Sequence, residues 1–296
     1  MDSSIFGISI ETFGILCGFA AAFSQALNYT FSKDCQEKYS LHGFRQLVAV
    51  HVFMFILSLI PFAFMGFYKY LSLELLWYET LVIAPYLCAQ YIMIKVFDAN
   101  DASIVSPLMT MKIPILALIS IIFMGKEFGV LQVFSIFIII GLGLYFSSLS
   151  GRARPLLLLV IAFACLLFCL SDIAMTSLTY KIGLPRFEAV RVGAVYEYLF
   201  CGFLAVPFMY KAKITLKSAW HAKWVAITWY FCTLTFIVTF NVNGVVEGNI
   251  IQTLRSVIGV LIAYIFYRKY IKDRNTFRKK LFITAGMFAA VTLYYA

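Results

Sequence analysis

The sequence predicts an all-α integral membrane protein with ten transmembrane helices, arranged as two inverted repeats of five. Three observations lead to this fold class. The chain of 296 residues is 62% hydrophobic and only 13% charged, with a mean hydropathy of +0.90, whereas about a quarter of the residues in a soluble domain are charged. It also contains ten long apolar runs, and its second half echoes its first.

Each apolar run has about the 20 residues that a helix needs to cross a bilayer. Within lipid the backbone must bond to itself, so each run is expected to form a helix. Short polar connections separate the runs and no soluble domain is inserted. The expected helices cover residues 10–31, 45–67, 73–95, 102–124, 128–149, 155–180, 188–210, 221–241, 246–267 and 277–295.

The internal repeat divides the chain into residues 1–150 and 151–296. FDANDASIVSPLMTMK (97–112) aligns with FNVNGVVEGNIIQTLR (240–255) at an offset of 143, and each segment ends on a base. Residues 44–62 align with 190–208, and 23–30 with 170–177, in the same order. Five helices are an odd number, so the two halves enter the membrane from opposite sides, and such repeats place a substrate site at the midplane between them.

Local motifs give the chain a family resemblance. PILALISIIFMGKEFGVLQVFSIFIIIGLGL (114–144) has a proline, an apolar run, a Gly-x-Glu turn and a glycine-rich helix, and an arginine lies early in helix 2 of each repeat, at Arg45 and Arg191. With the 5+5 helix count, these features resemble ten-helix, EamA-like members of the drug/metabolite transporter superfamily. Helix 9 departs from the pattern, because Val257 replaces the proline and YRKYIKD replaces the Gly-Glu turn.

The distribution of bases bears on orientation. Seventeen lysines and arginines lie on one side of the expected bundle and five on the other. The positive-inside rule therefore places both termini outside, whereas the family resemblance implies both termini inside. We expect a multi-pass protein of a bacterial inner (plasma) membrane.

Two bases interrupt the apolar runs. Lys112 and Arg255 lie about eleven residues inside helices 4 and 9, where a charge costs roughly 2.5–3.5 kcal/mol on insertion scales. One explanation is a structural ion pair with Asp172 or Glu197, the two acids placed well inside the expected spans. The other explanation is an anion bound from both sides. Arg would bind it through its planar guanidinium fork, and Lys would attract it as a point charge. The resemblance favours an anion, because phosphate-sugar and nucleotide-sugar carriers of the superfamily have bases at comparable places.

Other polar side chains complete the expected site. Gln25, Asn28, Tyr91, Asp172 and Gln252 would shape the substrate pocket, and Trp229 would stack on the ligand. Polar stripes also join helices by hydrogen bonds, and Tyr and Trp also form interfacial belts. Glu197 and Asp172 are candidates for proton coupling, because a carboxyl group in apolar surroundings takes up a proton more readily.

We therefore expect a secondary transporter that moves a small organic anion by alternating access: a phosphorylated metabolite, a nucleotide-linked sugar or a carboxylate. An exporter of amino acids or other zwitterions and drugs, and a flippase for a lipid-linked sugar or lipid phosphate, are the alternatives. The sequence has no Walker A, HExxH or GxSxG motif and no CxxC pair, so we expect no enzymatic activity, cofactor or metal. The expected partners are the substrate and the bilayer, without nucleic acid, for a monomer or homodimer.

Overall fold

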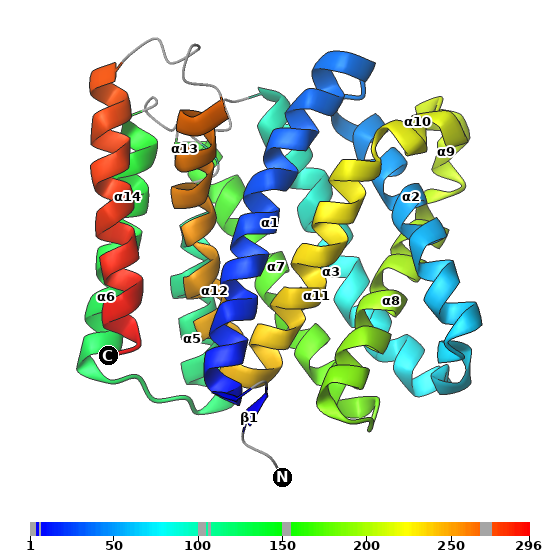
Figure 1. Ribbon diagram of the computed structural model, residues 1–296, viewed down its shortest axis with the longest axis horizontal. Helices are drawn as coiled ribbons and strands as arrows, with labels where there is room; N and C mark the ends of the chain where they lie inside the picture. Colours follow the sequence, from blue (N-terminus) through cyan, green and yellow to red (C-terminus); the bar gives the residue numbers. More distant parts are fainter. Residues whose placement is uncertain (1–3, 6, 100–104, 106–107, 150–154, 267–273) are drawn as a thin grey trace.

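A computed structural model describes residues 4–5, 7–99, 105, 108–149, 155–266 and 274–296, and the described elements are almost entirely helical (Figure 1). A two-stranded antiparallel ribbon, β1 (Ser4–Ile5) with β2 (Ile8–Ser9), precedes the bundle. The helices of the first half are α1 (Ile10–Tyr39), α2 (Gly43–Phe64), α3 (Leu73–Ala99), α5 (Lys112–Met124) and α6 (Val130–Ser148), with 3-10 turns η1 (Phe67–Tyr70) and η2 (Met109–Met111). Those of the second half are α7 (Pro155–Lys181), α8 (Arg186–Ala205), α9 (Phe208–Ala212), α10 (Leu216–His221), α11 (Lys223–Asn243), α12 (Val245–Gln252), α13 (Leu254–Phe266) and α14 (Arg274–Tyr294).

A helix lies over each of the ten predicted ranges, so the expectation of an all-α chain is confirmed. Within the described residues, six helices are long and apolar enough to cross a membrane: α1, α2, α3, α6, α7 and α11. This number fits a multi-pass membrane protein. Parts of the predicted helices 102–124 and 246–267, the boundary between 150 and 151, and the whole YRKYIKD turn (267–273) lie outside the described residues.

Several predicted boundaries were wrong. The first helix continues through Tyr39, eight residues beyond the predicted end, and carries a polar last turn. The seventh predicted helix stops at Ala205, and the rest of its range begins the short helix α9 after Pro207. Because Pro207 has no backbone N–H and a fixed φ, it fits the start of α9 and not the interior of a longer helix.

Two of the predicted helices have a local irregularity near a base, called a break below, where the hydrogen-bonding pattern changes while the backbone keeps right-handed helical dihedrals. In the first repeat the 3-10 turn η2 ends at Met111, and the α-helix starts at Lys112. In the second repeat α12 ends at Gln252, and α13 starts at Leu254, after Thr253. The two helices that follow the breaks, α5 and α13, have 13 residues each.

The helices pack in pairs that join the two halves of the chain. Helix α1 packs along α11 and α3 packs along α7, while α2 lies against α8 and α6 lies against α14. Figure 1 shows α6 and α14 side by side at one flank and α1 and α11 near the centre. The broken segments α5 and α12 pack against each other, and α1 contacts both α12 and α13.

Gly202 allows the close approach of α8 to α2. A Cβ atom at this position would lie 2.6 Å from the backbone oxygen of His51 and 2.3 Å from the Cβ of Phe55. Small residues let helix backbones pack closely where lipid provides no hydrophobic force between helices. The contact therefore needs glycine at this crossing.

Candidate functional site

Lys112 lies at the first turn of α5, inside the bundle. It is 7% exposed, and its ammonium lies 5.6 Å from the ring centroid of Phe168 and 5.7 Å from that of Phe236. Aromatic faces attract a cation more strongly when water is excluded. The two rings therefore offset part of the cost of removing this ammonium from water.

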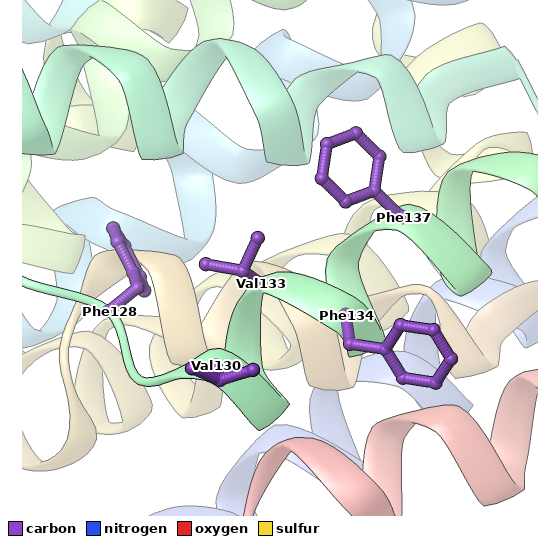
Figure 2. Close-up of a pocket in the computed structure, with 5 residues that line it drawn as sticks. All are labelled: Phe128, Val130, Val133, Phe134 and Phe137. Carbon is purple, nitrogen blue, oxygen red and sulfur yellow. The ribbon is translucent and has the colours of Figure 1, made fainter.

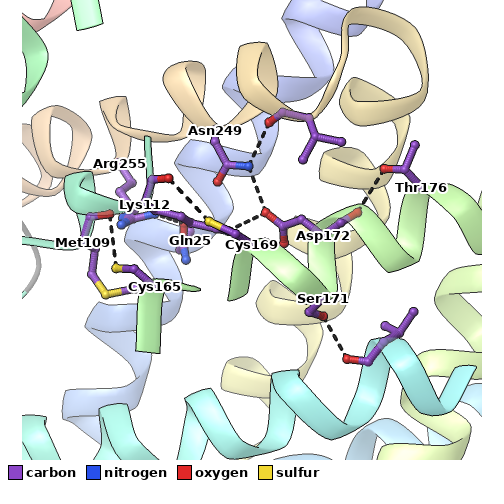
Figure 3. Close-up of polar contacts among 12 residues, drawn as sticks. Gln25, Met109, Lys112, Cys165, Cys169, Ser171, Asp172, Thr176, Asn249 and Arg255 are labelled. Carbon is purple, nitrogen blue, oxygen red and sulfur yellow. Dashed lines mark hydrogen bonds and ion pairs between the residues drawn. The ribbon is translucent and has the colours of Figure 1, made fainter. Parts of the chain in front are cut away.

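Asp172 of α7 forms an ion pair with Lys112 (Figure 3). The Lys112 Nζ atom is 2.6 Å from Asp172 Oδ2, and the Nδ2 group of Asn249 donates to the same oxygen at 2.9 Å. The predicted structural pair between Lys112 and an acid is therefore present. Asn249 belongs to α12, so this cluster joins α5 and α7 to the broken helix of the second repeat.

Arg255 lies one residue after the start of α13 and is 6% exposed. One of its terminal nitrogens donates to Gln25 Oε1 of α1 at 3.3 Å, and its Nε has no hydrogen-bond partner. No ion pair joins Arg255 to a carboxylate among the described residues. A buried guanidinium is thus held by an amide oxygen, which cannot neutralise its charge.

The structure brings the two bases to one region of the bundle. Lys112 and Arg255 both interact electrostatically with the buried thiols of Cys165 and Cys232, and Figure 3 shows both bases beside Gln25. With Asp172 ionised, the three charged groups carry a formal net charge of +1.

The helix breaks were not predicted, although the sequence contains part of their cause. Pro114 is the third residue of α5, where its missing N–H is tolerated. In the second repeat the Thr253 hydroxyl donates to the Ile250 oxygen at 2.7 Å, and the Thr253 N–H reaches the same oxygen at 3.1 Å. These local bonds replace the regular helical pattern without a proline.

The remaining predicted site residues differ in their surroundings. Gln252 is buried at the end of α12, beside the break. The Asn28 Nδ2 group donates to the Val225 oxygen at 2.7 Å and so joins α1 to α11. Tyr91 is half exposed and contacts Phe44 and Lys95, and Trp229 packs in a cluster with Tyr86 and Cys201. The cluster of Trp229 also contains Phe168, whose ring centroid lies 5.6 Å from the Lys112 ammonium.

Buried acids form a second polar group beside this site. Glu197 of α8 is 4% exposed and interacts electrostatically with Asp172. Glu79 of α3, which the sequence analysis did not single out, is 2% exposed and interacts with Glu197. Neither glutamate forms an ion pair among the described residues.

A third polar cluster joins the two halves near the C-terminus. Lys126, two residues beyond α5, forms an ion pair with Glu247 of α12, and the Tyr294 hydroxyl donates to the same carboxylate at 3.1 Å. A pocket of about 500 Å³ opens beside Glu247 and is also lined by Gln132 and Tyr295. We call this cluster of Lys126, Glu247 and Tyr294 the terminal lock.

Figure 2 shows an apolar surface pocket of about 340 Å³. Its lining consists of Phe128 and four residues of α6: Val130, Val133, Phe134 and Phe137. No charged or hydrogen-bonding side chain lines it, so we do not assign an anion to this pocket. Within the described part of the chain, no cluster of three or more His, Cys, Asp or Glu residues is arranged to hold a metal ion.

Comparisons with known proteins inform only the fold. No family model and no curated protein matches the chain. A solved structure described only as "Crystal structure of protein" is similar, with a TM-score of 0.66 at 12% identity. The similarity covers 94% of this chain and 98% of that one, so the whole described bundle resembles a fold that has been solved before.

Proposed function

We propose that this protein is a secondary transporter that binds a small organic anion between Lys112 and Arg255 and moves it by alternating access. The substrate class is a phosphorylated metabolite, a nucleotide-linked sugar or a carboxylate. The observation that carries the proposal is the buried guanidinium of Arg255, which has no carboxylate partner within the described residues and whose Nε is unbonded.

The electrostatics of the cluster favour an anionic ligand. A buried charge without a counter-ion costs several kcal/mol even after the surroundings relax. Asp172 neutralises Lys112, so about one positive charge remains in the site. An anion bound to Arg255 would supply the missing counter-charge and would use the free Nε as a donor.

The helix pairing supports ten spans in a 5+5 inverted repeat. If α7 is the counterpart of α1 and α11 that of α3, the packing of α1 on α11 mirrors that of α7 on α3. The pairs α2–α8 and α6–α14 each join an element to its own counterpart. Breaks beside both bases fit transporters whose discontinuous helices bind substrate near the midplane.

Within this proposal, the chain is an EamA-like member of the drug/metabolite transporter superfamily in a bacterial inner membrane. Gln25 orients the fork of Arg255, and Gln252 presents its amide at the break. Asp172 sets the charge of the site, and Glu197 is a candidate for coupling transport to protons. No catalytic step is required of any residue.

Ligand-induced thermal stabilisation of the purified protein tests the proposal. A ligand at about 100 times its Kd stabilises the bound state by about 2.7 kcal/mol, so a panel of phosphates, nucleotide sugars and carboxylates should raise the melting temperature. The stabilisation should be lost in Arg255→Met and Lys112→Met. The stabilisation should persist in the control variant Lys38→Ala, which removes one exposed positive charge from α1.

Transport in liposomes completes the test. The anion that stabilises the protein should exchange across the membrane, and both site variants should abolish that exchange. Normal transport by Arg255→Met and Lys112→Met would refute the assignment of the site.

A zwitterion is the second candidate, because the site also contains a carboxylate. Asp172 could bind an amine while Arg255 binds the carboxylate of an amino acid. Stabilisation by amino acids but not by the matching amine-free acids would favour this exporter. A lipid phosphate in the same panel tests the flippase alternative.

A further inference from the structure

We propose that Glu79 is a proton-binding site and that Glu79, Glu197 and Asp172 form a proton path that ends at Lys112. The inference rests on the proposed function, because it assigns the proton as the coupling ion of that transporter. It adds Glu79, which the substrate site does not contain. It also gives the Lys112–Asp172 ion pair a role in coupling proton movement to anion binding.

Glu79 lies on the buried face of α3, between Leu75 and Val82. Neither of its carboxyl oxygens is exposed, and neither has a hydrogen-bond partner among the described residues. An ionised carboxylate in such surroundings would lack both water and a counter-ion, at a cost far above that of a neutral carboxyl group. We therefore assign a proton to Glu79 in this conformation.

Glu197 of α8 interacts electrostatically with Glu79 from another helix. Each of these two buried carboxyl groups disfavours ionisation of the other, so at least one of them is protonated. The other titratable side chains among the described residues that interact with this pair are Tyr86 of α3, Asp172 of α7, Tyr196, Tyr198 and Cys201 of α8, and Tyr230 and Cys232 of α11. His51 of α2 lies beside Tyr86, and Tyr70 of η1 interacts with Tyr196. None of them is a lysine or an arginine.

Asp172 connects this pair to the substrate site. It interacts with Glu197 on one side, and its Oδ2 lies 2.6 Å from the ammonium of Lys112 on the other. Because the Glu79 oxygens have no hydrogen-bond partner within the described part of the chain in this conformation, the transfer requires a change of rotamer or a bridging water. When Glu197 gives its proton to Asp172 and accepts the proton of Glu79, one proton has moved along the path. Glu79 is left as a carboxylate, and Asp172 becomes neutral.

Neutral Asp172 no longer balances the charge of Lys112. The formal charge of the site then rises from +1 to +2, which favours a bound anion. Reprotonation of Glu79 would come from the end of the bundle where Glu74 is exposed. Glu74 and Glu79 are five positions apart in the sequence, which corresponds to about 7.5 Å along α3. Proton entry and anion binding are thereby coupled.

Chemical labelling tests the proton on Glu79. Dicyclohexylcarbodiimide, an apolar reagent, modifies protonated carboxyl groups in apolar surroundings. The full-length protein in liposomes should carry the adduct on Glu79 near neutral pH, as mapped by mass spectrometry. Glu74, which is exposed and paired with Lys181, is the internal control and should remain unlabelled. A folded protein with no adduct on Glu79 would overturn the assignment.

Substitutions test the coupling. Asp172→Asn mimics the protonated aspartate, so its affinity for the stabilising anion should rise at least about tenfold at alkaline pH. Glu79→Gln should keep anion exchange but lose the acceleration caused by an inward proton gradient, whereas Glu74→Gln should keep both. Full acceleration in Glu79→Gln, or unchanged affinity in Asp172→Asn, would overturn the path.

The two proposals fail in different ways. If the unaltered protein binds no anion, the proposed function and its coupling are both refuted, while the labelling still decides whether Glu79 holds a proton. If anions bind and exchange but a proton gradient has no effect, only the proton path is refuted.

Discussion

The ion pair between Lys112 and Asp172 makes a quantitative prediction about stability. The two atoms are 2.6 Å apart and both side chains are largely buried. At an effective dielectric constant near 20, their attraction is about 6 kcal/mol. The cost of dehydrating both groups opposes it. Removing one member leaves the other charge uncompensated, which typically costs about 3–5 kcal/mol.

A double-mutant cycle measures this coupling. We expect Lys112→Met and Asp172→Asn each to lower the free energy of unfolding by about 3–5 kcal/mol. The double variant, which has no buried charge at this place, should recover most of that loss. Titration with a denaturing detergent in mild-detergent micelles gives the unfolding free energies, and the difference between the double variant and the sum of the singles gives the coupling.

The exposed pair of Lys181 and Glu74 is the matched control. Its atoms lie 3.3 Å apart, but the side chains are 51% and 66% exposed. Solvent screens such a pair, so the same cycle should give no coupling beyond error. If the Lys112–Asp172 cycle is additive as well, the argument that this pair is electrostatically coupled is wrong.

Three further predictions follow from the same contacts. Arg255 has no carboxylate partner among the described residues, so Arg255→Met should destabilise the protein less than Lys112→Met in the same unfolding assay, and equal losses would show that Arg255 has an acidic partner. Lys126→Ala breaks the terminal lock, and a water-soluble maleimide should then label the buried Cys169 several-fold faster, with the exposed Cys88 as the reference thiol. Gly202→Val forces a side chain against the His51 backbone and should cost about 1–3 kcal/mol of unfolding free energy, whereas Gly141→Ala, which meets no atom within 4 Å, should not destabilise the fold.

Hydropathy was sufficient to locate the helices, because burial in lipid requires apolar residues at nearly every position. The same reasoning singled out Lys112 and Arg255, since a charge within an apolar run is conspicuous. It also named Asp172 as a partner, but it could not choose between Asp172 and Glu197. That choice depends on which faces of α7 and α8 turn toward α5, and no local pattern encodes it.

Glu79 was missed for a physical reason. It lies in WYETLV, near the start of α3, where aromatic and charged residues are typical of a membrane interface. Packing of α3 along α7, with further contacts to α8, buries it instead. The break at Thr253 was missed because it depends on hydroxyl and backbone bonds to Ile250, and threonine also occurs within unbroken helices, as Thr239 does in α11.

The 3-10 turn η2 precedes Lys112, so α5 is a stiff segment with a charged side chain at its first turn. Its 13 residues span about 20 Å, so a pivot of about 10° at η2 would swing its far end by about 3 Å. Lys126 stands just beyond that far end and is tied to Glu247. A ligand that displaces the Lys112 ammonium at the start of α5 would thus strain the terminal lock beyond its other end.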